Sequence, residues 1–155
     1  MPDFLLRTAA PEDLTFQRDL YATTREKEML AAQFTEEMRE SFIAMQFKAQ
    51  TTHYTQHYPT AEWSIIECDG ACAGRLVLYR CDEHFEILDI ALMPEFRGRG
   101  IGTALLRQVF AEAGLLPVRL FAFTGERAIE LYHRLGFSDV KVDPLHTELV
   151  WQAQP

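Results

Sequence analysis

The chain has 155 residues, 48% of them apolar, and a formal net charge of −8 at neutral pH. This length fits one domain, and the apolar fraction is enough for an ordinary hydrophobic core, which excludes a disordered chain. The acidic balance argues against nucleic acid and membrane surfaces as partners, because both bind proteins that present a positive field.

The cysteines Cys68, Cys72 and Cys81 form no C-x-x-C pair. We therefore expect reduced thiols in a cytoplasmic protein, since disulfides are rare in reducing compartments. Residues 1–7 contain no basic segment and a short apolar run, so we expect no targeting segment. No apolar run approaches the length that a membrane-spanning helix needs.

The first half of the chain is expected to hold one strand, two helices and then three consecutive strands. Pro11, with Glu12 and Asp13 beside the positive end of the helix dipole, marks the start of the first helix. Asp69-Gly70 is a tight-turn signal, so the strands on either side of it form a hairpin. The predicted ranges are strand 4–7, helix 11–24, helix 35–54, and strands 62–67, 74–79 and 84–92.

The helix predicted over residues 35–54 carries apolar side chains on two faces. One stripe contains Met38, Phe42, Met45 and Ala49, and the other contains Ile43, Phe47 and Tyr54. A helix that is apolar on two faces is either buried on both or lines a pocket or a partner. We expect core packing for these stripes, and the alternative places Phe47 and Tyr54 in the wall of a pocket.

The second half of the chain alternates helices and strands. Gly114 and Gly136 end two helices, and the strand between these helices is reached by a helical crossover. That strand should therefore lie parallel to the strand over 84–92. The predicted ranges are helix 101–113, strand 118–123, helix 126–135, and a terminal hairpin of strands 140–142 and 147–151. The order indicates an α/β (α+β) fold with a mixed, mostly antiparallel sheet and helices on both faces.

The junction between the strand at 84–92 and the helix at 101–113 carries the strongest functional signal. A helix N-terminus offers unpaired N–H groups and partial positive charge, and Gly98, Gly100 and Gly102 let the backbone approach a ligand closely. Arg97 and Arg99 add positive charge. These features predict a site for a phosphate-bearing ligand, and a tight turn that merely needs glycine is the alternative.

Two other glycine-rich phosphate sites are excluded at this junction. The dinucleotide fingerprint G-x-G-x-x-G fails, because Thr103 stands where the third glycine belongs. The P-loop fails as well, because the turn has no Gly-Lys pair followed by Ser or Thr.

The segment from Arg97 to Gly102 resembles the R/Q-x-x-G-x-G/A motif of the GCN5-related N-acetyltransferases. The segment from Ala128 to Phe137 is similar to the A-x-x-L-Y-x-x-x-G-F segment of the same family. In element order the resemblance extends from Arg7 to Trp151. It implies a GNAT-like acyl-CoA N-acyltransferase fold, a single N-acetyltransferase domain over residues 1–155, and acetyl-CoA (coenzyme A) as the co-substrate.

The resemblance also implies which residues contact this co-substrate. The N–H groups from Arg99 to Thr103 would bind its diphosphate, and the preceding strand would pair with its pantetheine arm. Such pairing needs an open strand edge, so the strand over 118–123 should splay away. The implied binding residues are Ile90, Ala91, Leu92, Arg97, Gly98, Arg99, Gly100, Ile101, Gly102 and Thr103. One departure is Gly125, which stands where many members have a cofactor-contacting asparagine.

An alkyl amine has a pKa of ~10.4 and is mostly protonated at neutral pH, so a general base is useful. Glu86 stands eleven positions before Arg97, the offset of the catalytic glutamate in a histone-acetylating branch of the family. It is the first candidate for the base, and Asp89 is the second. Successive strand residues point to opposite faces, so the two carboxylates share a face only if a bulge intervenes. A solvated carboxylate is the alternative for both.

The resemblance assigns two further catalytic roles. Tyr132 would protonate the departing thiolate, and the Leu92 N–H would stabilise the carbonyl oxygen. A tyrosine packed on the face of its helix is the alternative for Tyr132.

The resemblance thus implies transfer of an acetyl group from acetyl-CoA to a primary amine by direct attack in a ternary complex. The acceptor could be a small molecule, a peptide N-terminus or a protein lysine, and the acidic balance favours a cationic one. A non-catalytic acyl-CoA-binding or sensing module is one alternative, and an N-acyltransferase that uses another acyl-CoA is a second. A homodimer could form through the terminal hairpin or the two-striped helix.

His53 and His57 stand four residues apart, a spacing that can bind a metal ion. The chain has no H-E-x-x-H pattern and no evident third ligand, so we expect no metal site. The alternative is that these histidines face the acceptor pocket.

Overall fold

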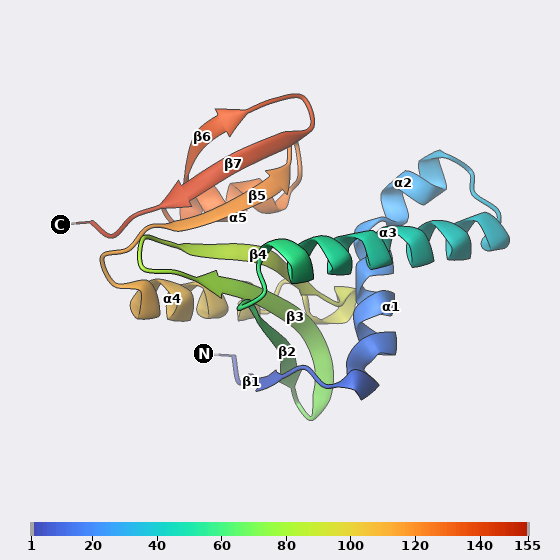
Figure 1. The fold of residues 1–155 in the computed structure, drawn as a ribbon, viewed down its shortest axis with the longest axis horizontal. Helices are drawn as coiled ribbons and strands as arrows, with labels where there is room; N and C mark the ends of the chain where they lie inside the picture. Colours follow the sequence, from blue (N-terminus) through green and yellow to red (C-terminus); the bar gives the residue numbers. More distant parts are fainter. Residues whose placement is uncertain (1, 155) are drawn as a thin grey trace.

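Seven strands form one sheet in the computed structural model, which describes residues 2–154 (Figure 1). The order across the sheet is β1-β2-β3-β4-β5-β7-β6, in which β4 and β5 are parallel and the other neighbours are antiparallel. The strands are β1 (Leu5–Thr8), β2 (Glu62–Cys68), β3 (Ala71–Arg80), β4 (Phe85–Leu92), β5 (Val118–Phe123), β6 (Ser138–Val142) and β7 (His146–Trp151). The predicted mixed, mostly antiparallel sheet is confirmed.

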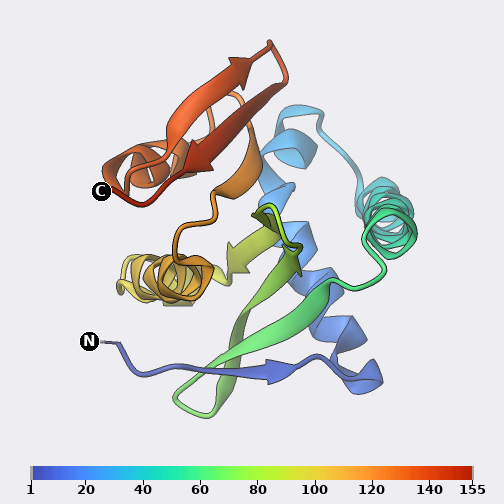
Figure 2. The ribbon, with the colours of Figure 1, turned by 60° about the vertical axis from the view of Figure 1, so that its left-hand side comes forward.

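Helices cover both faces of this sheet, as predicted. The helices are α1 (Leu14–Thr24), α2 (Glu26–Ala31), α3 (Glu36–His57), α4 (Ile101–Ala113) and α5 (Ala128–Arg134), with short 3-10 helices η1 (Pro11–Asp13) and η2 (Pro94–Phe96). Figure 2 shows α1 and α3 over one face and α4 and α5 over the other. Each side has its own apolar core. Leu106, Phe110 and Leu120 belong to the larger cluster under α4, and Tyr21 and Phe47 belong to the smaller cluster between α1 and α3.

The predicted boundaries agree closely for α4, which begins at Ile101 and ends at Ala113. Two differences concern the N-terminal helices. Arg25 leaves helical geometry at φ −110° and ψ 4°, so a separate helix α2 follows where the sequence predicted none. The predicted end of α3 at Tyr54 is too early, and the helix runs to His57. It stops there because Pro59 disfavours helical geometry at the residue before it.

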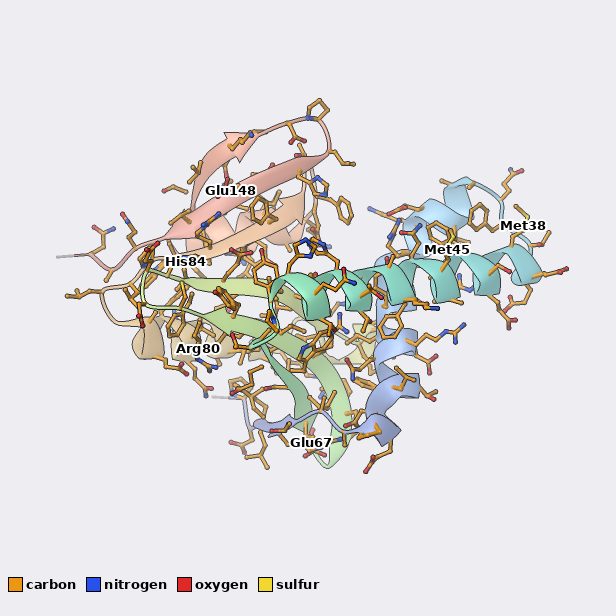
Figure 3. The ribbon with its side chains drawn as sticks, viewed as in Figure 1. Met38, Met45, Glu67, Arg80, His84 and Glu148 are labelled. Atoms are coloured by element: carbon orange, nitrogen blue, oxygen red, sulfur yellow. The ribbon has the colours of Figure 1, made fainter. Side chains whose placement is uncertain are left out.

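The two apolar stripes of α3 differ in how far they are buried. Ile43 and Phe47 are buried in the cluster that includes α1, whereas Met38 and Met45 are 49% and 61% exposed. Figure 3 shows both methionines on the part of α3 that extends past α1, away from the sheet. Core packing is confirmed for the stripe that faces α1. In the other stripe Phe42 packs against the same cluster, with its ring centroid 5.4 Å from that of Phe34, so core packing is wrong there only for the exposed residues such as Met38 and Met45.

No helix within residues 2–154 combines the length and the apolar character needed to cross a membrane.

β4 and β5 part after a short parallel pairing. Residues 85–87 of β4 pair with residues 118–120 of β5, and the pairing ends there although both strands continue. β4 stays paired with β3 as far as Leu92, while β5 stays paired with β7 as far as Phe123. The implied splay is therefore present, and it leaves one backbone edge of β4 open inside the sheet.

A bulge changes the direction of the side chains in the middle of β4. The pairing with β3 shifts by one residue at this point, so Leu88 has no partner opposite. The extra residue brings Asp89 to the face that carries Glu86, the condition under which the two carboxylates can share a face. The Leu88 carbonyl accepts a hydrogen bond from the Tyr54 hydroxyl at 2.7 Å, which satisfies the backbone group that the bulge displaces.

Gly74 lets β3 and β4 approach closely beside the opening. A Cβ atom at this position would overlap the Ala91 carbonyl oxygen and lie 2.9 Å from Leu92 Cδ2. Glycine in a strand interior usually weakens the strand, because it packs no side chain and loses more entropy on folding. The close approach to the second half of β4 is the physical reason for glycine here.

We predict that Gly74→Ala lowers the free energy of unfolding by about 1–3 kcal/mol, the usual cost of forcing an extra carbon into a packed site. Gly102→Ala is the matched control, because a Cβ there lies 3.9 Å from its nearest neighbour and alanine is the better helix former. Thermal unfolding of both variants tests this. An unchanged melting temperature for Gly74→Ala would contradict the close packing of β3 on β4.

Candidate functional site

A cavity of about 720 Å³ lies where β4 and β5 part, and residues of α1 and α3 line its other wall. Of the predicted site residues, Glu86, Ile90, Ala91 and Tyr132 line this cavity. Leu92 and the turn over 97–103 lie outside the lining and follow at the end of β4. The structure thus brings the two predicted catalytic side chains to one cavity. The predicted anion site lies just past the end of β4, the strand that lines this cavity.

Unpaired backbone N–H groups gather at the start of α4. The Ala104 N–H donates to the Gly100 carbonyl at 3.0 Å. Among the described residues, none accepts a hydrogen bond from the N–H groups of residues 98–103, and no side chain caps the helix. Gly98 and Gly100 have φ values of 74° and 81°, which residues with a Cβ rarely adopt. The turn therefore offers free donors to an anion.

Two cations lie at this turn. Arg97 Nε donates to the Leu92 carbonyl at 3.0 Å, so this side chain folds back over the end of β4. Arg99 Nη1 lies 3.8 Å from Asp69 Oδ2, and its guanidinium lies over the Phe96 ring, 5.1 Å from the centroid. Positive charge and free N–H groups coincide at the start of a helix, which is what a phosphate site requires.

The second half of β4 directs backbone groups toward the opening. The Met93 N–H donates to the Ala73 carbonyl of β3 at 2.8 Å. Backbone groups alternate in direction along a strand, so those of Leu92 and Ile90 point away from β3 and toward the opening. An extended ligand can pair with such an edge as an added strand. The edge and the turn together fit a long ligand that ends in phosphates.

Two neighbours hold Glu86 at the cavity. Its exposed fraction is 5%, its Oε2 accepts a hydrogen bond from the Tyr58 hydroxyl at 2.8 Å, and its Oε1 lies 3.4 Å from His84 Nε2. Burial and the bond to the Glu86 carboxylate raise the pKa of Tyr58 to about 12. Tyr58 therefore stays protonated at neutral pH and donates to the carboxylate.

Asp89 shares the face of Glu86 but is held by a buried cation. Arg75 Nε and Nη2 donate to Asp89 Oδ2 at 2.9 and 2.6 Å. The guanidinium of Arg75 is buried, and its Cζ lies 5.4 Å from the Trp63 ring centroid and 6.0 Å from that of Phe47. A buried cation is costly without a paired anion, so Asp89 serves as the counter-ion of Arg75. Of the two candidate bases, Glu86 is therefore the one whose hydrogen bond comes from the Tyr58 hydroxyl and not from a buried cation.

Tyr132 reaches the cavity from α5, on the other side of the sheet from Glu86. Its ring is buried and packs edge-on against Phe137, with the centroids 5.6 Å apart. Burial and the nearby carboxylates of Glu126 and Asp89 raise the pKa of Tyr132, so its hydroxyl is protonated at neutral pH. The parting of β4 and β5 lets a proton donor and a carboxylate from opposite faces line one cavity.

The alternative pocket residues on α3 divide into two groups. Tyr54 and His53 line the cavity, whereas Phe47 and His57 lie outside its lining. The rings of His53 and His57 are 4.4 Å apart. Within residues 2–154, no three His, Cys, Asp or Glu side chains form a group suited to a metal ion.

Three residues beside the cavity were not predicted from the sequence: Tyr58, His84 and Arg75. Tyr58 follows the predicted end of its helix, and an arginine in a strand is ordinarily a surface residue. The spacing of His84 and Glu86 is the one available signal, because residues two apart on a strand share a face.

We predict that Glu86→Gln lowers the pKa of Tyr58 from about 12 toward, but not to, its ordinary value of ~10. The substitution removes the negative charge that opposes ionisation of the phenol, while burial, the larger cause, remains. NMR of tyrosine labelled at the phenolic carbon follows this titration, with Tyr58→Phe for assignment. Because the folded protein favours the neutral phenol of Tyr58, this group stabilises the fold below pH 10. That stabilisation is lost as the pH rises from 10 toward 12. An unchanged titration would contradict the contact.

Residues 23–137 match the sequence model of the acetyltransferase (GNAT) family. An uncharacterised N-acetyltransferase of Methanocaldococcus jannaschii is 29% identical over 136 residues, a match that covers 70% of this chain and 60% of that protein. The chain therefore spans about 60% of the length of this relative.

Two of the solved structures that share the fold were determined with coenzyme A or acetyl-CoA bound. The PaiA N-acetyltransferase from Thermoplasma acidophilum in complex with coenzyme A is 20% identical with a TM-score of 0.73, over 97% of this chain and 99% of that one. A GNAT family acetyltransferase from Elizabethkingia anophelis with acetyl-CoA bound is 16% identical with a TM-score of 0.60, over 99% of this chain and 100% of that one. The fold is thus shared along the chain, and the family match covers most of it: this chain belongs to the acetyltransferase (GNAT) family.

Proposed function

We propose that the protein is an N-acetyltransferase that uses acetyl-CoA and acts on a primary amine. The observation that carries the proposal is a continuous path of three features along one strand and its following helix. These are the free N–H groups at the start of α4, the unpaired edge of β4, and the cavity lined by Glu86 and Tyr132. Family membership supports the activity, and the coenzyme A and acetyl-CoA in two structures of this fold support the ligand.

The chain has groups suited to each end of this co-substrate. The N–H groups from Arg99 to Thr103 bind the diphosphate, with the charge of Arg97 beside them. The open edge of β4 pairs with the amide-bearing arm through the outward-pointing backbone groups of Ile90 and Leu92, with Ala91 between them. Bound acetyl-CoA supplies a thioester that an amine can attack.

The two proposed proton transfers take place on opposite faces of the sheet. Glu86 takes the proton of the attacking amine, since Asp89 is paired with Arg75. The Leu92 N–H points toward the opening and donates to the carbonyl oxygen where negative charge develops. The hydroxyl of Tyr132 donates to the departing sulfur from the opposite side.

The acceptor that we propose is a small-molecule or peptide amine with a positive charge. Two acidic lining residues are paired with cations, Asp89 with Arg75 and Glu148 with Arg119. The other three acidic residues still outnumber the two basic ones, and this disfavours an anionic acceptor. The acidic lining residues are Glu86, Asp89, Glu126, Asp143 and Glu148, and the basic ones are Arg25 and Lys141.

The release of free thiol from acetyl-CoA with a panel of polyamines, amino acids and peptides tests the activity. We predict that Tyr132→Phe lowers kcat by about 10²-fold, the usual contribution of a general acid, and leaves the affinity for coenzyme A unchanged. A wild-type protein that binds coenzyme A but releases no thiol with any amine would favour a sensing module. Faster release from propionyl-CoA or succinyl-CoA would favour another acyl group.

Gly102→Asp tests the anion site separately from the chemistry. An acidic residue in the first turn suits the helix dipole, and a Cβ at Gly102 has room, so the fold should be as stable as the wild type or more so. We predict a loss of coenzyme A affinity of at least about 10-fold in calorimetry, because the new carboxylate repels the diphosphate. Gly102→Asn adds the same bulk without the charge and should lose less. Equal affinities for all three proteins would place the diphosphate elsewhere.

A further inference from the structure

The proton that Glu86 accepts has a defined neighbour to pass to. Glu86 is nearly buried, with a side-chain exposure of 7%, whereas the side chain of His84 is 19% exposed. His84 Nε2 lies 3.4 Å from Glu86 Oε1, and its other ring nitrogen, Nδ1, lies 3.4 Å from Cys81 Sγ. Figure 3 shows His84 where the β3–β4 turn enters β4. The imidazole therefore stands between the base and the outer end of the strand.

The other groups that face this pair are poor destinations for the proton. The Tyr58 hydroxyl already donates to Glu86, and its pKa of about 12 keeps it protonated. Arg119, opposite Glu86 on β5, is a cation paired with Glu148 at 3.0 Å. The titratable and charged groups around the pair are Tyr58 from the end of α3, Tyr79 from β3, Cys81 from the β3–β4 turn and Arg119 from β5.

We propose that His84 is a positioning residue that acts through Glu86 by taking over its proton, an inference that rests on the proposed function. The amine N–H bond breaks as an O–H bond forms on the Glu86 carboxylate. That proton moves from Oε1 to His84 Nε2, and the imidazolium releases its Nδ1 proton to solvent. The carboxylate is thereby regenerated. Proton exchange with water, in which Nε2–H is lost and Nδ1–H is regained, returns the imidazole to the tautomer that accepts the next proton.

The transfer has an energetic reason. An ordinary imidazole holds a proton about two pH units more tightly than an ordinary glutamate carboxylate, ~6.5 against ~4.3. For ordinary groups this difference favours the proton on the imidazole over the carboxylate by about 100-fold, so the transfer frees the carboxylate to accept the next proton.

The test is the pH profile of kcat/KM for the acceptor, from about pH 6 to about pH 10, with His84→Gln and His84→Ala. We expect both variants to be about 10- to 100-fold slower near neutral pH and to approach the wild-type rate at about pH 10, where much of the amine is already neutral. Free imidazole should restore part of the rate of His84→Ala. His57→Gln, an exposed histidine outside the cavity lining, is the matched control. Calorimetry should give one coenzyme A affinity for all of these proteins.

Several outcomes would overturn the relay while the proposed function stands. A deficit of the same size at every pH, without rescue by imidazole, would mean that His84 has a structural role. No deficit at any pH would mean that water in the cavity takes the proton from Glu86. Full activity of Glu86→Gln would show that Glu86 is not the base, and a relay that acts through Glu86 would then be excluded. A wild-type protein that transfers nothing to any amine would instead contradict the proposed function itself.

Discussion

The site depends on the point at which β4 and β5 stop pairing. Their parallel pairing ends at Ile87, because β5 turns away from β4 while it stays paired with β7. Unpaired backbone groups inside a sheet cost free energy unless something satisfies them. Side chains satisfy two carbonyls along this edge, since Tyr54 donates to Leu88 and Arg97 donates to Leu92. The remaining edge groups are those that a ligand can pair with. The same gap admits Tyr132 from one face of the sheet to a cavity that holds Glu86 on the other.

The order of elements along the chain turns this local opening into an extended site. β4 is followed directly by η2 and α4, so the free N–H groups at the helix start lie just past the end of the free strand edge. A ligand that pairs with the edge is thereby directed toward donors and positive charge at one end and toward the carboxylate of Glu86 at the other. Gly74 contributes from β3, because a side chain there would push the Ala91 carbonyl out of place.

This arrangement explains which features the sequence could predict. The limits of α4 follow from glycines that act locally, Gly100 before it and Gly114 after it, and the predicted limits are correct. The contacts of Arg75 and Tyr58 depend on partners far along the chain, so no local pattern marks them. The bulge at Leu88 depends on register with β3, and register is invisible in a single strand. The periodicity of α3 predicted two apolar faces, but it does not indicate which of their side chains other elements cover.

Register also decides which of the two carboxylates is the better candidate for the proposed base. The bulge brings Glu86 and Asp89 to one face, and their partners then separate their roles. Protonating Asp89 would leave the buried guanidinium of Arg75 without its counter-ion, and breaking a buried pair in this way costs about 3–5 kcal/mol. Protonating Glu86 weakens a hydrogen bond from a neutral phenol, which costs far less. A carboxylate paired with a buried cation holds the structure together, and for this reason the base that we propose is Glu86, whose hydrogen bond comes from a neutral phenol.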